Sequence, residues 1–145
     1  YYAAHMERDG ASSLFAAKDH PYVSRYVSGW GAPDDMGVIG YHGGTRIGAV
    51  WSRILTGERK TYGYVDDRTP ELAAAVLPEH AGKGVGTALL RAHLERVKDR
   101  YPAITLVVRT DNPAVRLYLR EGFTIEATIV NRVGTESYHM IKRFP

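Results

Sequence analysis

Cysteine is absent from this sequence of 145 residues. Its absence excludes disulfide bonds, cysteine-ligated zinc and catalysis by a thiol. No apolar run reaches the length of a membrane span, and the first residues lack the apolar core of a signal peptide. We therefore expect a cytoplasmic protein with no membrane partner and no metal site, whose chemistry comes from histidine, tyrosine, hydroxyl or carboxylate side chains.

Charge is also modest, since 24% of the residues are charged and the net charge is +3. The basic residues form no stripe with interleaved aromatic side chains, which argues against a nucleic-acid partner. A mild positive charge suits a small ligand that carries several phosphates. The hydrophobic share of 44% and the length predict one domain, residues 1–145, that is large enough for a proper core.

The hydrophobic pattern predicts the element order α-α-β-β-β-α-β-α-β-β. The second helix covers residues 20–30 and carries an aromatic face, for which we favour packing in the core over a wall for a substrate. An α/β fold follows, with one mixed sheet flanked by helices on both faces. The expected strands are residues 36–41, 46–55, 71–77, 104–108, 124–130 and 137–143, and the long helix is 85–100.

A glycine-rich loop connects the strand at 71–77 to the long helix. Such a turn presents backbone N–H groups at the positive end of the helix dipole, which makes a site for an anion, most often phosphate. A P-loop would need Gly-Lys-Ser/Thr, and the loop does not contain it. A dinucleotide fingerprint would need a third glycine where Thr87 stands. An ordinary strand–helix turn remains the alternative for the loop alone.

The strand at 71–77 contains three consecutive alanines, residues 73–75. Buried strands usually carry larger, β-branched residues, so the small side chains leave room for another group. That group is either a closely packed helix or the extended arm of a ligand, and the sequence favours neither.

Two motifs resemble those of the GNAT N-acetyltransferases. The loop Ala81–Gly86 resembles the family motif Arg/Gln-x-x-Gly-x-Gly/Ala, with a match at Gly84 and Gly86 and a departure at Ala81. The second motif follows the strand at 104–108, and its order and spacing make the resemblance specific over residues 71–123. It matches at Asn112, Val115, Tyr118, Gly122 and Phe123.

The resemblance implies an enzyme that transfers an acetyl group from acetyl-CoA to a primary amine by direct attack in a ternary complex, with CoA as the product. The acceptor would be a small molecule or a peptide, and a homodimer is possible. Members of the family begin with a strand and then a helix. We therefore expect the first strand and part of the first helix to be missing from this chain.

The resemblance also implies catalytic roles. Tyr118 would donate a proton to the leaving thiolate; an ordinary core tyrosine is the alternative. Glu71 would be the general base, acting through water, although a solvated carboxylate at the end of a strand is equally consistent with the sequence. His80 and His139 are weaker candidates for the base. The pair Asp66 and Asp67 could attract a cationic amine, although we favour an ordinary solvated loop for these two residues.

The cofactor would lie along the glycine-rich loop and the adjoining strand. Main-chain groups near Val76 and Leu77 would hold the pantetheine arm and supply an N–H for the oxyanion. Asn112 would contact the arm, or would instead cap the following helix. The pyrophosphate would be held by Gly82, Lys83, Gly84, Val85, Gly86 and Thr87.

Two other functions remain open from the sequence. The departure at Ala81 and the doubtful base leave room for a catalytically silent module that binds acyl-CoA. A nucleotide-dependent oxidoreductase could also use a glycine-rich loop, although Thr87 and the lack of an acidic residue for a ribose argue against it.

Overall fold

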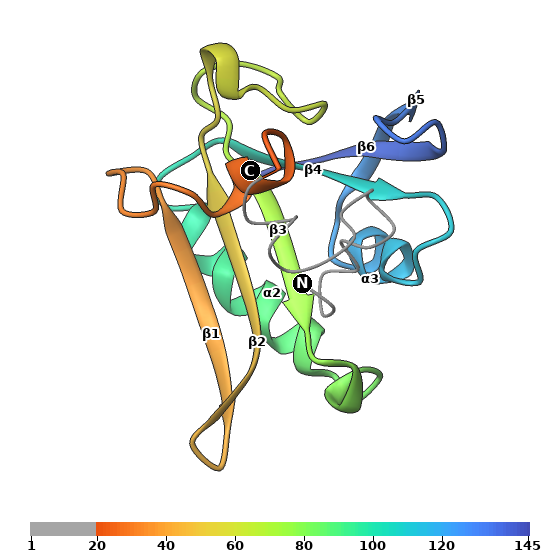
Figure 1. Cartoon of the computed structure of the whole chain (residues 1–145). Helices are drawn as coiled ribbons and strands as arrows, with labels where there is room; N and C mark the ends of the chain where they lie inside the picture. Colours follow the sequence, from red (N-terminus) through yellow and green to blue (C-terminus); the bar gives the residue numbers. More distant parts are fainter. Residues whose placement is uncertain (1–19) are drawn as a thin grey trace.

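The computed structural model describes residues 20–145 (Figure 1). The expected first helix and the question of a missing first strand concern residues 1–19, which lie outside this range. Three short 3-10 turns, η3 (Val23–Tyr26), η4 (Gly57–Arg59) and η5 (Pro78–His80), interrupt the described chain. The strands are β1 (Met36–His42), β2 (Thr45–Arg53), β3 (Glu71–Val76), β4 (Ala103–Arg109), β5 (Thr124–Val130) and β6 (Glu136–Arg143), and the helices are α2 (Val85–Val97) and α3 (Ala114–Arg120).

The six strands form one mixed sheet in the order β1-β2-β3-β4-β6-β5. All neighbouring strands pair antiparallel except β3 and β4, which are parallel. The crossover between these two strands is made by α2, as a parallel connection requires. The predicted mixed α/β sheet is thus confirmed, and its strands lie within a few residues of the predicted bounds.

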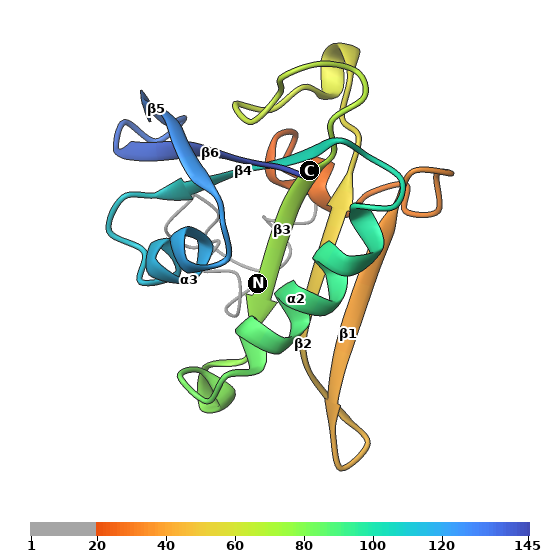
Figure 2. The same cartoon turned by 180° about the vertical axis from the view of Figure 1, so that it is seen from behind.

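Helix α2 covers one face of the sheet, which Figure 2 shows from the front. Its apolar stripe recurs at helical spacing and packs into the core beside Val50, Leu72 and Met140. His93 lies on the same stripe and is fully buried, with its Nε2 2.9 Å from Ser52 Oγ on β2. The other buried residues of the stripe are Leu89, Leu90, Leu94 and Val97.

The opposite face of β2 and β3 is covered by the segment at residues 20–30. The expectation of a core-packed α-helix there is wrong, since only the 3-10 turn η3 forms and Trp30 is 51% exposed. Gly29 at the end of the segment and Gly31 just after it have positive φ, which does not continue a helix. Trp51 of β2 donates from Nε1 to the carbonyl of Tyr26 at 2.9 Å, which ties the segment to this face.

Arg53, at the end of β2, fixes the same segment through its side chain. The guanidinium donates to both carboxylate oxygens of Asp35 at 3.0 and 3.2 Å. It also donates to the carbonyls of Arg25, Ser28 and Gly29 at 2.7–3.2 Å. These contacts use the fork geometry of arginine and satisfy its donors in a place where the residue is only 2% exposed.

Strands β3 and β4 pair at a single position, Glu71 with Thr105. Thr105 donates from its backbone N–H to Pro70 at 3.0 Å, and beyond this point the two strands diverge. Figure 1 shows β3 continuing away from β4, which instead follows β6. The sheet is therefore open between β3 and β4 along most of its length. Within residues 20–145, no helix is long and apolar enough to cross a membrane.

We expect Arg53→Met to lower the free energy of unfolding by about 3–5 kcal/mol. The substitution leaves the Asp35 carboxylate and three backbone carbonyls without their charged donor in a buried place. Urea unfolding at pH 7 measures the change. The matched control is Arg143→Ala, which removes an exposed ion pair with Glu126 and should cost less than about 1 kcal/mol. Equal losses in the two variants would contradict the anchoring role of Arg53.

Candidate active site

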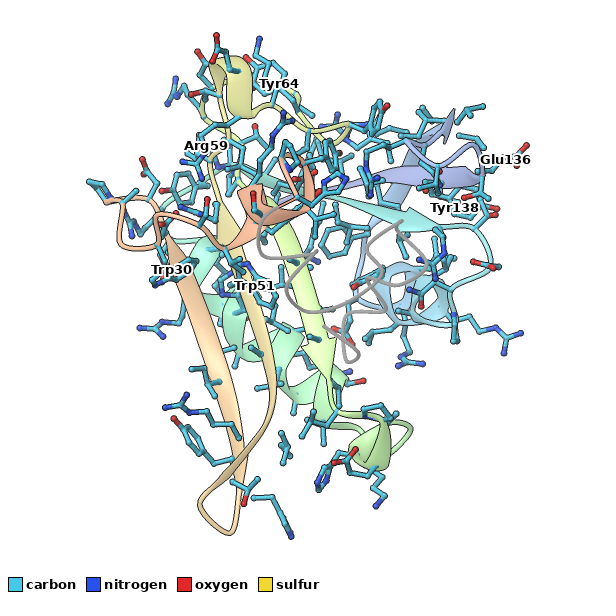
Figure 3. All side chains as sticks on the ribbon, viewed as in Figure 1. Trp30, Trp51, Arg59, Tyr64, Glu136 and Tyr138 are labelled. Carbon is cyan, nitrogen blue, oxygen red and sulfur yellow. The ribbon has the colours of Figure 1, made fainter. Side chains whose placement is uncertain are left out.

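A cavity of about 180 Å³ occupies the opening between β3 and β4. Small side chains of β3, Ala73 and Ala74, form one wall, and β4 residues from Leu106 to Arg109 form another. An aromatic wall comes from the segment at 20–30, from Trp51 and from the loop at 57–69. Figure 3 labels Trp51 on β2 next to this segment, with Arg59 and Tyr64 on the loop. The remaining polar lining residues are Asn112, Asn131, Arg132 and Ser137.

The main chain of β3 presents hydrogen-bonding groups to this opening. Leu77 donates its N–H to Ile47 at 2.9 Å, and Val76 pairs with Gly48 of β2. Because antiparallel residues alternate between bonding and non-bonding pairs, the N–H and C=O of Val76 and of Ala74 point away from β2. They therefore face the side that β4 leaves open. Of the two predicted main-chain positions, Val76 has a donor for a ligand, whereas the N–H of Leu77 is already used within the sheet.

The glycine-rich loop leads from β3 into α2. Gly82 and Gly84 have φ of 73° and 84°, and a side chain at either position would meet nothing within 4 Å. Gly84 is the N-cap residue of α2 and supplies no side-chain hydrogen bond, so the first N–H groups of the helix, at Val85, Gly86 and Thr87, have no cap. Lys83 is exposed in the same loop. The loop is thus open and rich in donors, as binding of a pyrophosphate requires.

A positive side chain reaches the loop from α3. Arg120 Nη2 lies 3.4 Å from Thr87 Oγ1, although the two residues are 33 positions apart. Ala81, which replaces the usual arginine or glutamine of the motif, is exposed and has no charge of its own. The residues of the loop and the open side of β3 therefore fit a cofactor that carries phosphates and an extended arm.

Tyr118 and Asn112 both line the cavity. Tyr118 lies on α3, is 7% exposed and packs edge-on against Phe123 with the ring centroids 5.7 Å apart. Burial raises the pKa of Tyr118 to about 12. Asn112 accepts a hydrogen bond from the N–H of Ala114, the first residue of α3, at 2.9 Å and also borders the cavity, whereas the N-cap residue of α3 is Pro113. Asn112 thus supports the start of the helix without being its N-cap residue, and its contact with the cofactor arm stays a prediction.

Glu71 is buried at the closed end of the opening, where β3 and β4 still pair. It is only 5% exposed and does not line the cavity, so it is not a solvated carboxylate at a strand end. Burial raises its pKa from 4.5 to about 7, and hydrogen bonds from Thr61, Tyr26 and the Gly63 N–H oppose this shift. Thr61 Oγ1 lies 2.7 Å from each carboxylate oxygen. A carboxyl group with this pKa can exchange a proton near neutral pH.

The loop at 57–69 closes over Glu71 and is held there by contacts to three elements. Thr105 of β4 donates from Oγ1 to the Gly63 carbonyl at 2.9 Å. The N–H of Tyr62 donates to the Tyr22 hydroxyl at 3.0 Å. Gly63 is required by packing, since a Cβ atom there would overlap with Glu71 Oε1. The loop therefore gives Glu71 a fixed and dry environment.

Sequence reasoning missed the residues that reach the site from separate elements. Tyr22 and Tyr26 were considered for a substrate wall but preferred as core residues, whereas both line the cavity. Their aromatic character was the available signal. No sequence motif indicated a role for the loop residues Thr61 and Gly63, because their positions depend on long-range contacts. The same holds for Arg109, Asn131 and Arg132, which lie at strand ends and in a turn.

The weaker candidates for the base lie elsewhere. His80 packs its ring against His42, with the centroids 5.7 Å apart. His139 lies on β6 and, like His80, is not among the residues that line the cavity. Asp66 and Asp67 accept hydrogen bonds from neighbours in their own loop. In the described part of the chain, no group of three or more histidine and carboxylate side chains could hold a metal ion.

Comparison with known proteins places this geometry in a family. The model of the acetyltransferase (GNAT) family matches residues 3–123, which is most of the chain. No curated protein matches the sequence significantly.

Solved structures show the same fold at low sequence identity. A ribosomal-protein-alanine N-acetyltransferase from Brucella melitensis is 20% identical, with a TM-score of 0.63, over 74% of this chain and 68% of that one. Nourseothricin acetyltransferase is 25% identical, with a TM-score of 0.61, over 78% and 67% of the two chains.

A putative acetyltransferase from Salmonella typhimurium, solved with acetyl-CoA, is 21% identical with a TM-score of 0.62, over 75% of this chain and 64% of that one. The family model covers both motifs, the glycine-rich loop and the segment from Asn112 to Phe123. The chain therefore belongs to the GNAT family of acetyltransferases and is an acetyl-CoA-dependent N-acetyltransferase.

Proposed function

We propose that this enzyme acetylates a primary amine by direct attack in a ternary complex, with Glu71 as the general base and Tyr118 as the general acid. The observation that carries the proposal is the cavity between β3 and β4, which brings Tyr118 to one wall while a buried carboxyl group lies behind another. Holding both reactants in one cavity makes the largest contribution to the rate, because it replaces a bimolecular encounter.

The cofactor site consists of the loop and of the open side of β3. Acetyl-CoA supplies the activated acetyl group there and leaves as CoA. The main chain of Val76 and Leu77 borders its arm, with the Val76 N–H as the donor that points into the opening. Asn112, in the turn before α3, borders the same arm. The phosphates are held by Gly82, Lys83, Gly84, Val85, Gly86 and Thr87.

Tyr118 serves as the proton donor. Its phenol stays protonated at any working pH because burial raises its pKa to about 12. A thiolate that is taken into the same dry cavity also has a raised pKa, because burial disfavours its charged form. The hydroxyl therefore gives its proton to the leaving sulfur and regains one afterwards.

Glu71 serves as the proton acceptor. Near pH 7 about half of its population is ionised, which combines an available base with a sufficient affinity for the proton. Asp66 and Asp67 are engaged within their own loop.

The acceptor is a small-molecule or peptide amine. The cavity offers Tyr22, Tyr26, Trp51 and Tyr62 as an apolar wall with polar tips, which suits an amine on an organic scaffold. One structural relative is a ribosomal-protein-alanine N-acetyltransferase, and another is nourseothricin acetyltransferase. A screening panel should therefore contain peptides with N-terminal alanine and amines of the antibiotic class, with acetyl-CoA consumption as the readout.

We expect Tyr118→Phe to lower kcat by about 100-fold, which is typical of the loss of a general acid. The dissociation constant for acetyl-CoA, measured by calorimetry, should stay within about twofold, because the ring and its packing on Phe123 remain. The test uses an acceptor found in the panel, at saturating acetyl-CoA. Full kcat in the variant would remove Tyr118 from the acid role, and no acetyl transfer by the wild-type enzyme to any amine would contradict catalysis itself.

Glu71→Gln should remove a pH dependence of stability. The pKa of Glu71 is higher in the folded state, about 7, than its ordinary value of 4.5, so the folded state holds the proton more tightly. Wild-type stability is therefore lost as pH rises from 4.5 through 7, by roughly 3 kcal/mol in total. Urea unfolding at pH 5 and pH 8 should show this loss in the wild type and not in the variant.

The same variant should lose the acid limb of the pH–rate profile. In the stability experiment, an equal difference in unfolding free energy between wild type and Glu71→Gln at pH 5 and at pH 8 would contradict the raised pKa of Glu71. An unchanged activity profile would dispose of Glu71 as the base even if the stability result held.

We further propose a homodimer in the cytoplasm. Strand β5 is one of the two edge strands of the described sheet, and six of its seven residues are exposed. They include Ile125 at 44% and Val130 at 68% exposure, and such an edge can pair with a second copy. Light scattering should give twice the mass of the chain, and Ala127→Pro should give a monomer. A wild-type monomer at all concentrations would contradict the proposal.

A further inference from the structure

The hydroxyl group of Thr61 is oriented by the turn in which it lies. The N–H of Gly63 donates to Thr61 Oγ1 at 3.3 Å, and the N–H of Tyr64 donates to the Thr61 carbonyl at 3.1 Å. A hydroxyl oxygen that accepts from the N–H two residues further on stabilises such a turn. Because Thr61 Oγ1 already accepts this bond, its own proton is left to donate to another group.

The group that receives this proton is the carboxyl of Glu71. Thr61 Oγ1 lies 2.7 Å from Oε1 and 2.7 Å from Oε2, so its one proton faces both oxygens. Thr61 is 9% exposed and Glu71 is 5% exposed, so water competes little for this bond. A donor placed equally near both oxygens fixes the orientation of the carboxyl group and favours its ionised form, which only accepts hydrogen bonds.

Two other elements hold the turn against Glu71. Thr105 of β4 donates from Oγ1 to the Gly63 carbonyl at 2.9 Å. From the segment at 20–30, the Tyr22 hydroxyl accepts from the N–H of Tyr62 at 3.0 Å. The backbone of Gly63 packs so closely on the carboxyl that a Cβ atom there would overlap with it. The contact between hydroxyl and carboxyl is therefore fixed from several sides.

The surroundings of Glu71 disfavour its charge. The titratable side chains on the elements packed around it include Tyr22 and Tyr26 on the segment at 20–30, Tyr62 on the loop and Arg53 on β2. Burial raises the pKa of both Tyr22 and Tyr26, so these two side chains stay neutral, and the guanidinium of Arg53 is paired with Asp35. Burial also raises the pKa of Glu71, and the hydrogen bond from Thr61 is the first of the contacts that limit this rise to about 7.

We propose that Thr61 is a positioning residue that keeps Glu71 oriented and ionised as the general base. This inference rests on the function proposed above, in which the carboxylate of Glu71 takes up the proton that the acceptor amine loses. Thr61 exchanges no proton with the acceptor, and it is not among the residues that line the cavity. It therefore acts only through Glu71, by stabilising the carboxylate before the proton arrives.

Thr61→Val tests this role, since valine keeps the branched shape and removes the hydroxyl. The acid limb of the pH–rate profile should move up by roughly one pH unit, because the carboxylate loses a hydrogen bond. At pH 7 kcat should then fall by about fivefold, and at pH 9 it should return to within about twofold of the wild type. A merely structural role would lower kcat equally at the two pH values.

Two matched variants control for the loss of the hydroxyl. Thr61→Ser keeps the donor and should keep the acid limb of the wild type. It also covers the case in which Thr61→Val folds poorly, because a displaced limb with the hydroxyl retained would overturn the proposal. Thr69→Val removes a hydroxyl that donates to Asp66 in the same loop at 2.8 Å, and it should behave like the wild type.

A second readout does not depend on turnover. Carboxyl titration of isotope-labelled protein by NMR should give a higher midpoint for Glu71 in Thr61→Val than in the wild type. An unchanged midpoint, or an equal loss of kcat at pH 7 and pH 9, would overturn the role of Thr61 and leave Glu71 as the base if Glu71→Gln is slow. A raised midpoint with an unmoved acid limb would instead show that Glu71 is not the base, which overturns both proposals.

Discussion

The structure depends on a single pairing between two parallel strands. β3 and β4 meet at Glu71 and Thr105 and then separate, while the rest of the sheet remains continuous. Within residues 20–145, the separation leaves the backbone groups of Val76 and Ala74 on this side without a strand partner, and buried backbone groups need such bonds from another source. The same opening holds the cavity. One local departure from regular pairing thus provides both the space that a thioester arm needs and backbone donors that could bind it.

The pairing also places the candidate base in the driest part of the site. Where β3 and β4 still pair, the neighbouring strands and loop 57–69 exclude water from Glu71, and this exclusion raises its pKa to about 7. A carboxyl at the open end would be a weaker base, because solvent would hold its pKa near 4.5. Proton affinity and access to the cavity therefore oppose each other at this carboxyl group.

Sequence predicted what is local and contiguous. The strands, α2, the glycine-rich loop and the motif from Asn112 to Phe123 are encoded by short-range patterns, and their family was recognisable from two segments. The segment at 20–30 was predicted wrongly because its aromatic spacing fits a helix, whereas Arg53 and Trp51 bind its carbonyls and hold it in another shape. Thr61 and Gly63 could not be predicted, since only contacts across the fold bring them to Glu71.

The departure at Ala81 shows why a motif is better judged in space than along the chain. The loop lacks the usual charge at this position, and from the sequence this loss weakened the case for the cofactor. In the fold, α3 brings Arg120 to within 3.4 Å of Thr87, so a guanidinium lies at the loop even though none comes from residue 81. The main-chain donors at the start of α2 are unaffected by the identity of residue 81. A substituted motif residue therefore removes a function only when no other element supplies the same chemistry at the same place.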